Sequence, residues 1–260
     1  MKRYILAILT FLIAHSTFAQ FATTYIDELE LKFKVKQIDE FMQRFNYDIT
    51  YDGKRPIIAK DSIKYKEGRV KNMLTLFNLD KFMDKNKRPS KLASDFLEYA
   101  INNNYRLNYA DSTWTANVKC WGTYQGQKRA INLTLKVEKI KGVEYKWVIA
   151  SVDGKIFDPL KEKRDSSLQI SPAEHGIGFI SLPTLLNTNA SSIVSFDSKE
   201  YKNENLSIFN YLIATRTLRL TSVEKVSYHY RLGEYCFDVE RIEKEKSYNK
   251  GWLINNIKHN

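Results

Sequence analysis

The sequence predicts an α+β protein of two tandem units, each with helices packed on a curved, cone-like antiparallel β-meander, the second unit being reduced. After residues 102–104 the apolar spacing changes from three or four residues to two, the change expected where helices give way to strands. The pattern of residues 137–152 also returns at 239–257, with a Val-x-x-Ile spacing followed by a tryptophan. Both copies are typical of the last hairpin of a sheet.

The N-terminus has the features of a secretory signal peptide. Lys2 and Arg3 precede an apolar run over residues 4–14, and small residues at Thr17 and Ala19 fit a cleavage site. The apolar run is about half of the ~20 residues that span a bilayer. We therefore expect removal of residues 1–19 and export to a periplasm or beyond, with no transmembrane segment in the mature protein.

The repeat sets the predicted domain boundaries. The first unit covers residues 20–154, a linker covers 155–174, and the second, smaller unit of the same type covers 175–260. The linker is charged, contains serine and proline, and has no sustained apolar period. The segment 96–107 matches 209–220 without a gap, which predicts the same helix-to-strand transition in both units.

Within the first unit, an amphipathic helix is expected over 27–45, where apolar residues recur every three or four positions. A shorter helix is expected near 70–77, and another after Pro89 with Ser90 as its N-cap. The remaining expected elements share a two-residue apolar period; they are strands at 105–109, 114–120, 131–137 and 147–152 and, in the second unit, strands at 226–230, 235–239 and 252–257.

The charge balance indicates solvated surfaces. Loss of Lys2 and Arg3 with the signal peptide lowers the formal net charge from +11 to +9. This balance favours anionic partners, but the basic residues are interleaved with acidic ones, so a nucleic-acid partner is not the expectation. Cys120 and Cys236 lie in strand patterns and are expected as buried free thiols, with a disulfide as the alternative that an exported protein permits.

The order of one long helix, shorter helices and a meander that ends in the Trp-led strand 146–150 resembles the nuclear-transport-factor-2-like (cystatin-like α+β) superfamily. The resemblance covers residues 25–153 and, more weakly, 175–257. It implies a cone whose sheet and helices enclose a pocket. Members include isomerases, dehydratases and cyclases as well as non-catalytic exported domains, and they often dimerise through their sheets. The two units are therefore expected to form an intramolecular pseudo-dimer in a monomer.

Motifs for catalysis, metals and cofactors are not found in the sequence. The mature chain has no H-x-x-x-H, H-x-H or G-x-S-x-G pattern, and the glycines around Ile177 lack the third glycine of a dinucleotide fingerprint. We therefore predict no catalytic residue, metal or cofactor. The predicted ligand-binding residues are three aromatic residues of one hairpin and a histidine beside two glycines, namely Trp114, Trp121, Tyr124 and His175.

Among these residues, Trp121 is the principal candidate because its parity places it on the sheet face opposite to Trp114. The leading hypothesis is a non-enzymatic binding or scaffold protein of the cell envelope, whose partner is a small molecule, a glycan or an envelope protein. One alternative is a small-molecule isomerase, dehydratase or hydrolase with its pocket in the first unit. The other is a binder of anionic envelope polymers.

Overall fold

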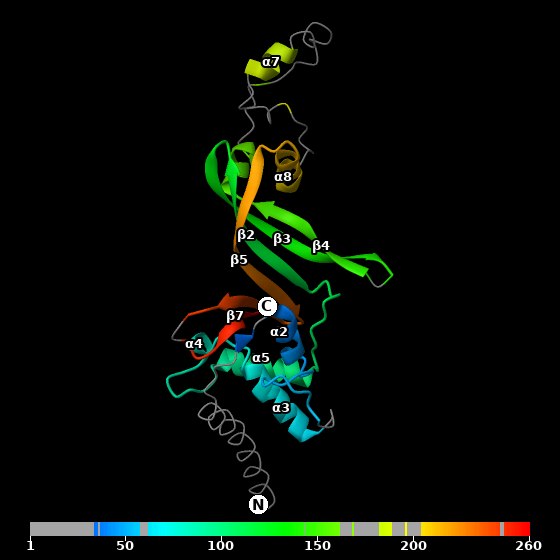
Figure 1. Cartoon of the computed structure of the whole chain (residues 1–260), viewed down its shortest axis with the longest axis vertical. Coiled ribbons are helices and arrows are strands. Elements are labelled where there is room, and N and C mark those ends of the chain that lie inside the picture. Colours follow the sequence, from blue (N-terminus) through cyan, green and yellow to red (C-terminus); the bar gives the residue numbers. More distant parts are fainter. Residues whose placement is uncertain are drawn as a thin grey trace, which may run out of the picture. The chain divides into compact units, whose positions relative to one another are not determined.

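The computed structural model describes residues 34–35, 37–57, 62–142, 144–161, 168, 182–188, 196, 204–244 and 247–260. Within these ranges the chain is α+β, as predicted, and Figure 1 shows its helices and its sheet. The predicted signal peptide, the first part of the helix expected at 27–45, most of the predicted linker and His175 lie outside the described residues.

The strands form a sheet with the order β1-β7-β6-β5-β2-β3-β4. β1 runs parallel to β7, whereas β5–β6 and β6–β7 are antiparallel pairs. The register of the last hairpin pairs Phe237 with Ile257 and Val239 with Ile254, all four of which are buried. The bounds are β1 Lys34–Val35, β2 Trp114–Tyr124, β3 Gln127–Lys141, β4 Glu144–Asp153, β5 Leu218–Leu232, β6 Tyr235–Ile242 and β7 Lys250–His259.

The chain divides into two compact units, but the division does not follow the predicted linker. Unit 1 comprises Met1–Asn117, Lys136–Val148 and Val226–Asn260, and unit 2 comprises Val118–Leu135 and Ile149–Lys225. Two tandem units are therefore not confirmed. The physical reason is that the C-terminal strands contribute Tyr230, Phe237 and Ile254 to the same core as the N-terminal helices.

In unit 1, α3 packs against both α2 and α5, and α2 also packs against β7 (Figure 1). The bounds of the unit 1 helices are α2 Ile38–Phe45, α3 Ile63–Leu74, α4 Leu79–Phe82 and α5 Lys91–Asn102. Ser90 caps α5 as predicted, because its hydroxyl accepts a hydrogen bond from the Ala93 N–H at 3.3 Å. Ser62 caps α3 in the same way through Tyr65.

Two of the predicted elements in unit 1 are wrong in part. The helix expected over 27–45 begins only at Ile38, because residues 34–35 pair with β7 as a strand. The strand expected at 105–109 does not form. There, the Asn46 side chain binds both the N–H and the C=O of Leu107, so these backbone groups are not offered to a neighbouring strand.

Stacked aromatic rings fill the space between the helices and the sheet of unit 1. Trp114 lies on Tyr230 with ring centroids 5.4 Å apart, Tyr230 on Phe237 at 4.9 Å, and Phe237 on Phe45 at 5.9 Å. The planes of each pair differ by 12° or less. Large buried rings of this kind supply most of a core's apolar contact area.

Unit 2 has a separate core beneath its part of the sheet. Besides strand segments it contains the 3-10 helix η1 (Lys155–Lys161), α7 (Leu182–Thr188) and α8 (Asn205–Ala214). Phe157 of η1 is fully buried, so the start of the predicted linker is part of a core. Phe209 of α8 packs in the same cluster, whose other buried members are Cys120, Ile131, Leu133, Val152 and Leu218. Cys120 here and Cys236 in unit 1 are both buried and free.

Candidate functional site

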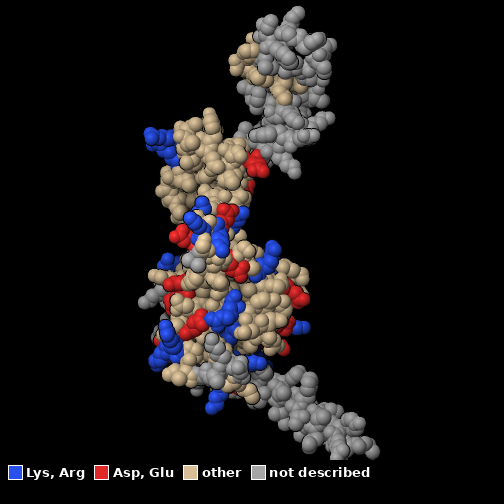
Figure 2. Space-filling view, turned by 90° about the vertical axis from the view of Figure 1, so that its right-hand side faces the viewer, with Lys and Arg blue, Asp and Glu red and all other residues tan. Residues whose placement is uncertain are grey.

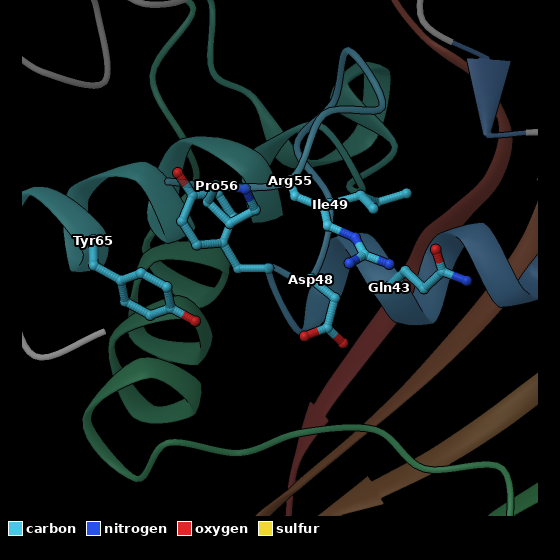
Figure 3. A pocket seen from close by; sticks show the side chains of 7 residues that line it. Gln43, Asp48, Ile49, Arg55, Pro56 and Tyr65 are labelled. Atoms are coloured by element: carbon cyan, nitrogen blue, oxygen red, sulfur yellow. The ribbon is translucent and has the colours of Figure 1, made fainter. Parts of the chain in front are cut away.

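A surface cleft opens in unit 1 where α2 ends and the chain turns toward α3 (Figure 3). Its volume is about 620 Å³, within the range of small-molecule sites. The lining combines apolar and aromatic side chains with amide and charged groups; it consists of Gln43, Tyr47, Asp48, Ile49, Arg55, Pro56 and Tyr65.

Two tyrosines form the aromatic wall of the cleft. The rings of Tyr47 and Tyr65 meet edge to face, with centroids 5.0 Å apart. Tyr47 has a positive φ of 59°, and its hydroxyl lies over Gly68 of α3, where a Cβ atom would come within 2.2 Å of it. Burial, with a smaller effect from Tyr65, raises the pKa of Tyr47. The Tyr47 phenol therefore remains protonated at neutral pH.

The charged groups of the cleft have different surroundings. Asp48 accepts a hydrogen bond from the Arg106 guanidinium at 2.6 Å, so an adjacent positive charge balances its carboxylate. Arg55 is exposed, and its side chain reaches toward Gln43 in Figure 3. Among the described residues no ion pair to Arg55 is formed. Within the described part of the chain, the positive charge of Arg55 is therefore not balanced by an ion pair.

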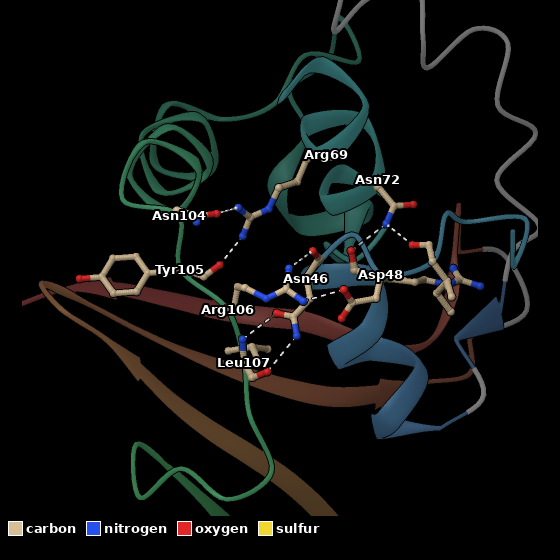
Figure 4. Close-up of polar contacts among 10 residues, drawn as sticks. Asn46, Asp48, Arg69, Asn72, Asn104, Tyr105, Arg106 and Leu107 are labelled. Carbon is tan, nitrogen blue, oxygen red and sulfur yellow. Dashed lines mark hydrogen bonds and ion pairs between the residues drawn. The ribbon is translucent and has the colours of Figure 1, made fainter. Parts of the chain in front are cut away.

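Buried polar side chains hold the walls of the cleft from behind (Figure 4). Asn46 bonds to both backbone groups of Leu107, at 2.9 and 2.7 Å. Asn72 of α3 donates to the carbonyls of Arg44 at 2.7 Å and Ile49 at 3.0 Å, which joins α3 to the loop after α2. Buried amides with several partners fix a loop in one conformation.

Arg69 extends this network toward the end of α5. It is 2% exposed and donates to the Asn104 side chain at 3.1 Å and to the Tyr105 carbonyl. Burial lowers the pKa of Arg69 from its ordinary value. Because guanidinium groups stay charged in proteins, Arg69 places a fixed positive charge behind the cleft.

Of the four residues predicted from the sequence to bind a ligand, Trp114 belongs to unit 1, and Trp121 and Tyr124 belong to unit 2. Trp114 is 3% exposed within the unit 1 core, and Tyr124 packs against the unit 2 core. His175 lies outside the described residues. Trp121 belongs to unit 2, is half-buried, and alternates with the buried Cys120 along β2, so it lies on the opposite sheet face.

Cations surround the Trp121 ring. The Lys128 ammonium lies 4.3 Å from the ring centroid, and that of Lys119 lies 5.7 Å from it. Lys119 also donates to Glu224 at 2.9 Å. Contacts between ammonium groups and an indole ring are favourable by ~0.5–1 kcal/mol at exposed sites. Trp121 is thus an aromatic surface beside positive charge.

A histidine and a carboxylate form a second polar group in unit 1. His229 Nδ1 and Asp238 Oδ1 are 2.8 Å apart across β5 and β6, and Asn256 of β7 donates to the other Asp238 oxygen at 2.9 Å. The three residues follow the strand register. Among the described residues, no three His, Cys, Asp or Glu side chains are grouped closely enough to hold a metal ion.

Sequence reasoning missed the cleft because its residues were assigned to the end of a helix and a loop. Asn46, Tyr47 and Asp48 directly follow the end of the helix expected at 27–45, and Gly53 and Pro56 are residues that commonly form turns. The sequence feature that could have indicated the cleft was the presence of a tyrosine and an arginine in a loop between two helices. The partners that fix this loop, such as Arg106, are some 60 residues away in the sequence.

Comparisons with protein-family models, curated proteins and solved structures give no significant match to this chain. Within the described ranges, no helix has both the length and the apolar character needed to cross a membrane.

Proposed function

We propose that the protein is an exported, non-enzymatic binding protein of the cell envelope, and that the unit 1 cleft takes a small organic anion. The observation that carries the proposal is the exposed Arg55 guanidinium in a cleft where Asp48, the only acidic lining residue in the described part of the chain, is already paired with Arg106. A guanidinium binds a carboxylate through two parallel hydrogen bonds, which fixes the orientation of the ligand.

The remaining lining suits the body of such a ligand. The edge-to-face pair of Tyr47 and Tyr65, together with Ile49 and Pro56, offers apolar and aromatic surface. Gln43 adds an amide that can donate or accept a hydrogen bond. Apolar and aromatic surface combined with placed polar groups is what a small-molecule site needs for affinity and orientation.

The walls are prepared for binding before a ligand arrives. Asn72 holds the backbone at Arg44 and Ile49, and Arg106 holds both the Asp48 carboxylate and the Asn46 carbonyl. Binding to a fixed site avoids the entropic cost of ordering a loop. This favours recognition by the cleft over a loop that folds around its ligand.

The rival proposal is an isomerase, dehydratase or hydrolase with a pocket enclosed by the sheet and helices. Large aromatic side chains fill the described part of that interior, where Phe41, Phe96, Tyr230 and Phe237 are each 1% exposed or less. This filling supports binding at the outer cleft over catalysis in the interior. The likeness to nuclear-transport-factor-2-like domains and the intramolecular duplication also remain proposals, supported by the sequence repeat.

An NMR titration of the protein with benzoate and its neutral analogue benzamide tests the cleft. We expect benzoate to shift the signals of Arg55 and Tyr65, and benzamide to do so much more weakly. Arg55→Ala should weaken benzoate binding by about tenfold or more, because a charge-assisted contact is lost. Lys54→Ala is the matched control, since Lys54 pairs with Asp52 and does not line the cleft.

Two results would contradict the proposal. Equal binding of benzoate and benzamide, or no binding of either, would show that Arg55 does not recognise a carboxylate in this cleft. Shifts confined to the Trp114 indole and its neighbours would instead favour a ligand in the interior of unit 1, as the enzymatic alternative requires.

A further inference from the structure

We infer that unit 2 carries a second, independent site, in which Trp121 and its surrounding cations bind an acidic polysaccharide. The inference goes beyond the proposed cleft, because every residue in it belongs to unit 2. It rests on the placement of the indole ring, on the charges beside it, and on the polar groups of the same sheet face.

One face of this part of the sheet is packed and the other carries Trp121. The packed face holds Cys120 of β2, Ile131 of β3 and Leu218 of β5, all 3% exposed or less and in one cluster with α8. Since side chains alternate along a strand, Trp121 points to the other face. The half-buried indole ring on that face is a flat apolar surface on which a sugar ring can stack.

The charge around the ring selects an anionic ligand. Lys128 lies 4.3 Å from the centroid and Lys119 lies 5.7 Å from it, and among the described ion pairs only Lys119 is paired with an acid, Glu224. Arg219 alternates with the buried Leu218 along β5, which places it on the same face as Trp121. Its backbone carbonyl is also next to Gly122, so β5 approaches β2 closely here. Among the described side chains beside Trp121, positive charge therefore exceeds negative charge.

Short polar side chains share this face. Thr123 alternates with Gly122 and lies on the same side of β2 as Trp121, and Asn132 alternates with the buried Ile131 of β3. Hydroxyl and amide groups match the hydroxyl groups of a sugar. A carboxylate on that sugar can then pair with the Lys128 ammonium, which the indole ring holds in place.

A glycan fits these observations better than a nucleic acid or a membrane. Single-stranded nucleic acids bind to grooves with several aromatic platforms along a basic track, whereas this face presents one described tryptophan. On the molecular face drawn in Figure 2, Lys and Arg are interleaved with Asp and Glu and form no continuous basic patch. The recognition is therefore local, at one ring and its neighbouring charges.

Binding of the full chain to immobilised polygalacturonate, a polymer of a sugar acid, tests the inference. We expect retention that rising salt weakens, and no retention on the neutral polymer dextran. Trp121→Ala and Lys128→Gln should each weaken binding by roughly tenfold, and Trp121→Phe should retain part of it. Trp147→Ala and Lys146→Gln, on exposed positions of unit 1, are the matched controls and should bind as the unmodified chain does.

Thermal unfolding of each variant shows whether a loss of binding is a loss of fold, and Lys128→Gln keeps the test valid if Trp121→Ala does not fold. Unchanged binding by both Trp121→Phe and Lys128→Gln would overturn the inference, as would equal retention on dextran or no retention on polygalacturonate. Stronger binding to oligo(dT) or to phosphatidylglycerol vesicles than to polygalacturonate would overturn it as well. Arg55→Ala should leave this binding unchanged, so failure of the cleft proposal remains a separate result.

Discussion

At the scale of single residues, Tyr230 shows how a buried polar group shapes stability. Its ring is stacked between Trp114 and Phe237, but its hydroxyl is buried without a hydrogen-bond partner among the described residues. Burial, followed by Tyr228 and Tyr109, raises the pKa of Tyr230 well above its ordinary value. Stacking of the ring stabilises the folded state, whereas burial of the hydroxyl without a partner destabilises it.

Tyr230→Phe should therefore increase the free energy of unfolding by about 1 kcal/mol near neutral pH, because the unpaired hydroxyl is removed and the ring is kept. The substitution should also reduce the loss of stability at alkaline pH. Since the folded-state pKa is raised, the stability contributed by the protonated phenol is complete below the unfolded value of about 10 and is lost as pH rises through the folded value.

Urea unfolding at a series of pH values measures both effects. Tyr248→Phe is the control, because Tyr248 is exposed and should alter neither the neutral-pH stability nor its alkaline slope. A destabilised Tyr230→Phe protein would mean that the hydroxyl has a partner that stabilises the fold.

At the scale of elements, the tight turn between β5 and β6 depends on Gly233. This residue has φ +56°, and an added Cβ would come within 2.3 Å of the Tyr99 hydroxyl and 2.5 Å of the Tyr105 hydroxyl. Gly142, between β3 and β4, has nearly the same φ of +57° but nothing within 4 Å of the Cβ position. A comparison of alanine substitutions at Gly142 and Gly233 therefore separates the cost of backbone strain from the cost of steric crowding.

Gly142→Ala should cost about 1 kcal/mol, the penalty of an L-residue in the left-handed region. Gly233→Ala should cost that amount and ~1–3 kcal/mol more, because the two tyrosine side chains must move. Denaturant unfolding compares the variants, and equal costs would show that Tyr99 and Tyr105 yield without penalty. Gly233→Ala combined with Tyr105→Phe should recover part of the difference.

The elements themselves were largely predictable, because their signals are local. The alternation that predicted strands at 114–120, 131–137 and 147–152 is confirmed in β2, β3 and β4, and Ser90 is confirmed as an N-cap. Their pairing was not predictable. A periodic pattern shows that Phe237 faces a core, but not that this core is built by α2 and α5.

The candidate site was less accessible to prediction than the fold. The sheet face on which Trp121 lies could be predicted from the alternation of side chains along the strand. The position of the Lys128 ammonium over the Trp121 ring could not, because it depends on the hairpin between β2 and β3. The cleft depends on contacts such as Arg106 with Asp48, which join a loop to a segment that no local pattern connects with it. Side-chain networks between distant segments carry no periodic signal.

At the scale of the whole molecule, the unit 1 core draws on segments from both ends of the described chain, whereas the unit 2 core is built from segments between them. The unit 1 core combines the helices α2 to α5 and Trp114 of β2 with β5, β6 and β7. The unit 2 core combines β2, β3, β4 and the start of β5 with η1 and α8. The tandem arrangement predicted from the repeat requires instead that residues 20–154 bury their own core. These two arrangements make opposite predictions for an isolated fragment.

A fragment of residues 20–154 should not fold. It lacks Tyr230, Phe237, Val239, Leu253 and Ile254, all 1% exposed or less in the unit 1 core, so its helices would expose their apolar faces to water. Each large side chain lost from a core removes ~1.5–3 kcal/mol of burial, and the sum exceeds the stability of a typical domain. Circular dichroism and the dispersion of amide NMR signals measure the outcome.

Residues 20–260 with the substitution Tyr248→Phe serve as the folded control, since that exposed position leaves both cores intact. A cooperative unfolding transition in the 20–154 fragment would support the tandem arrangement, because the N-terminal helices would then have found a core without the C-terminal strands. Failure to fold, followed by recovery of native signals on adding a 218–260 peptide, would establish that β5 to β7 complete unit 1.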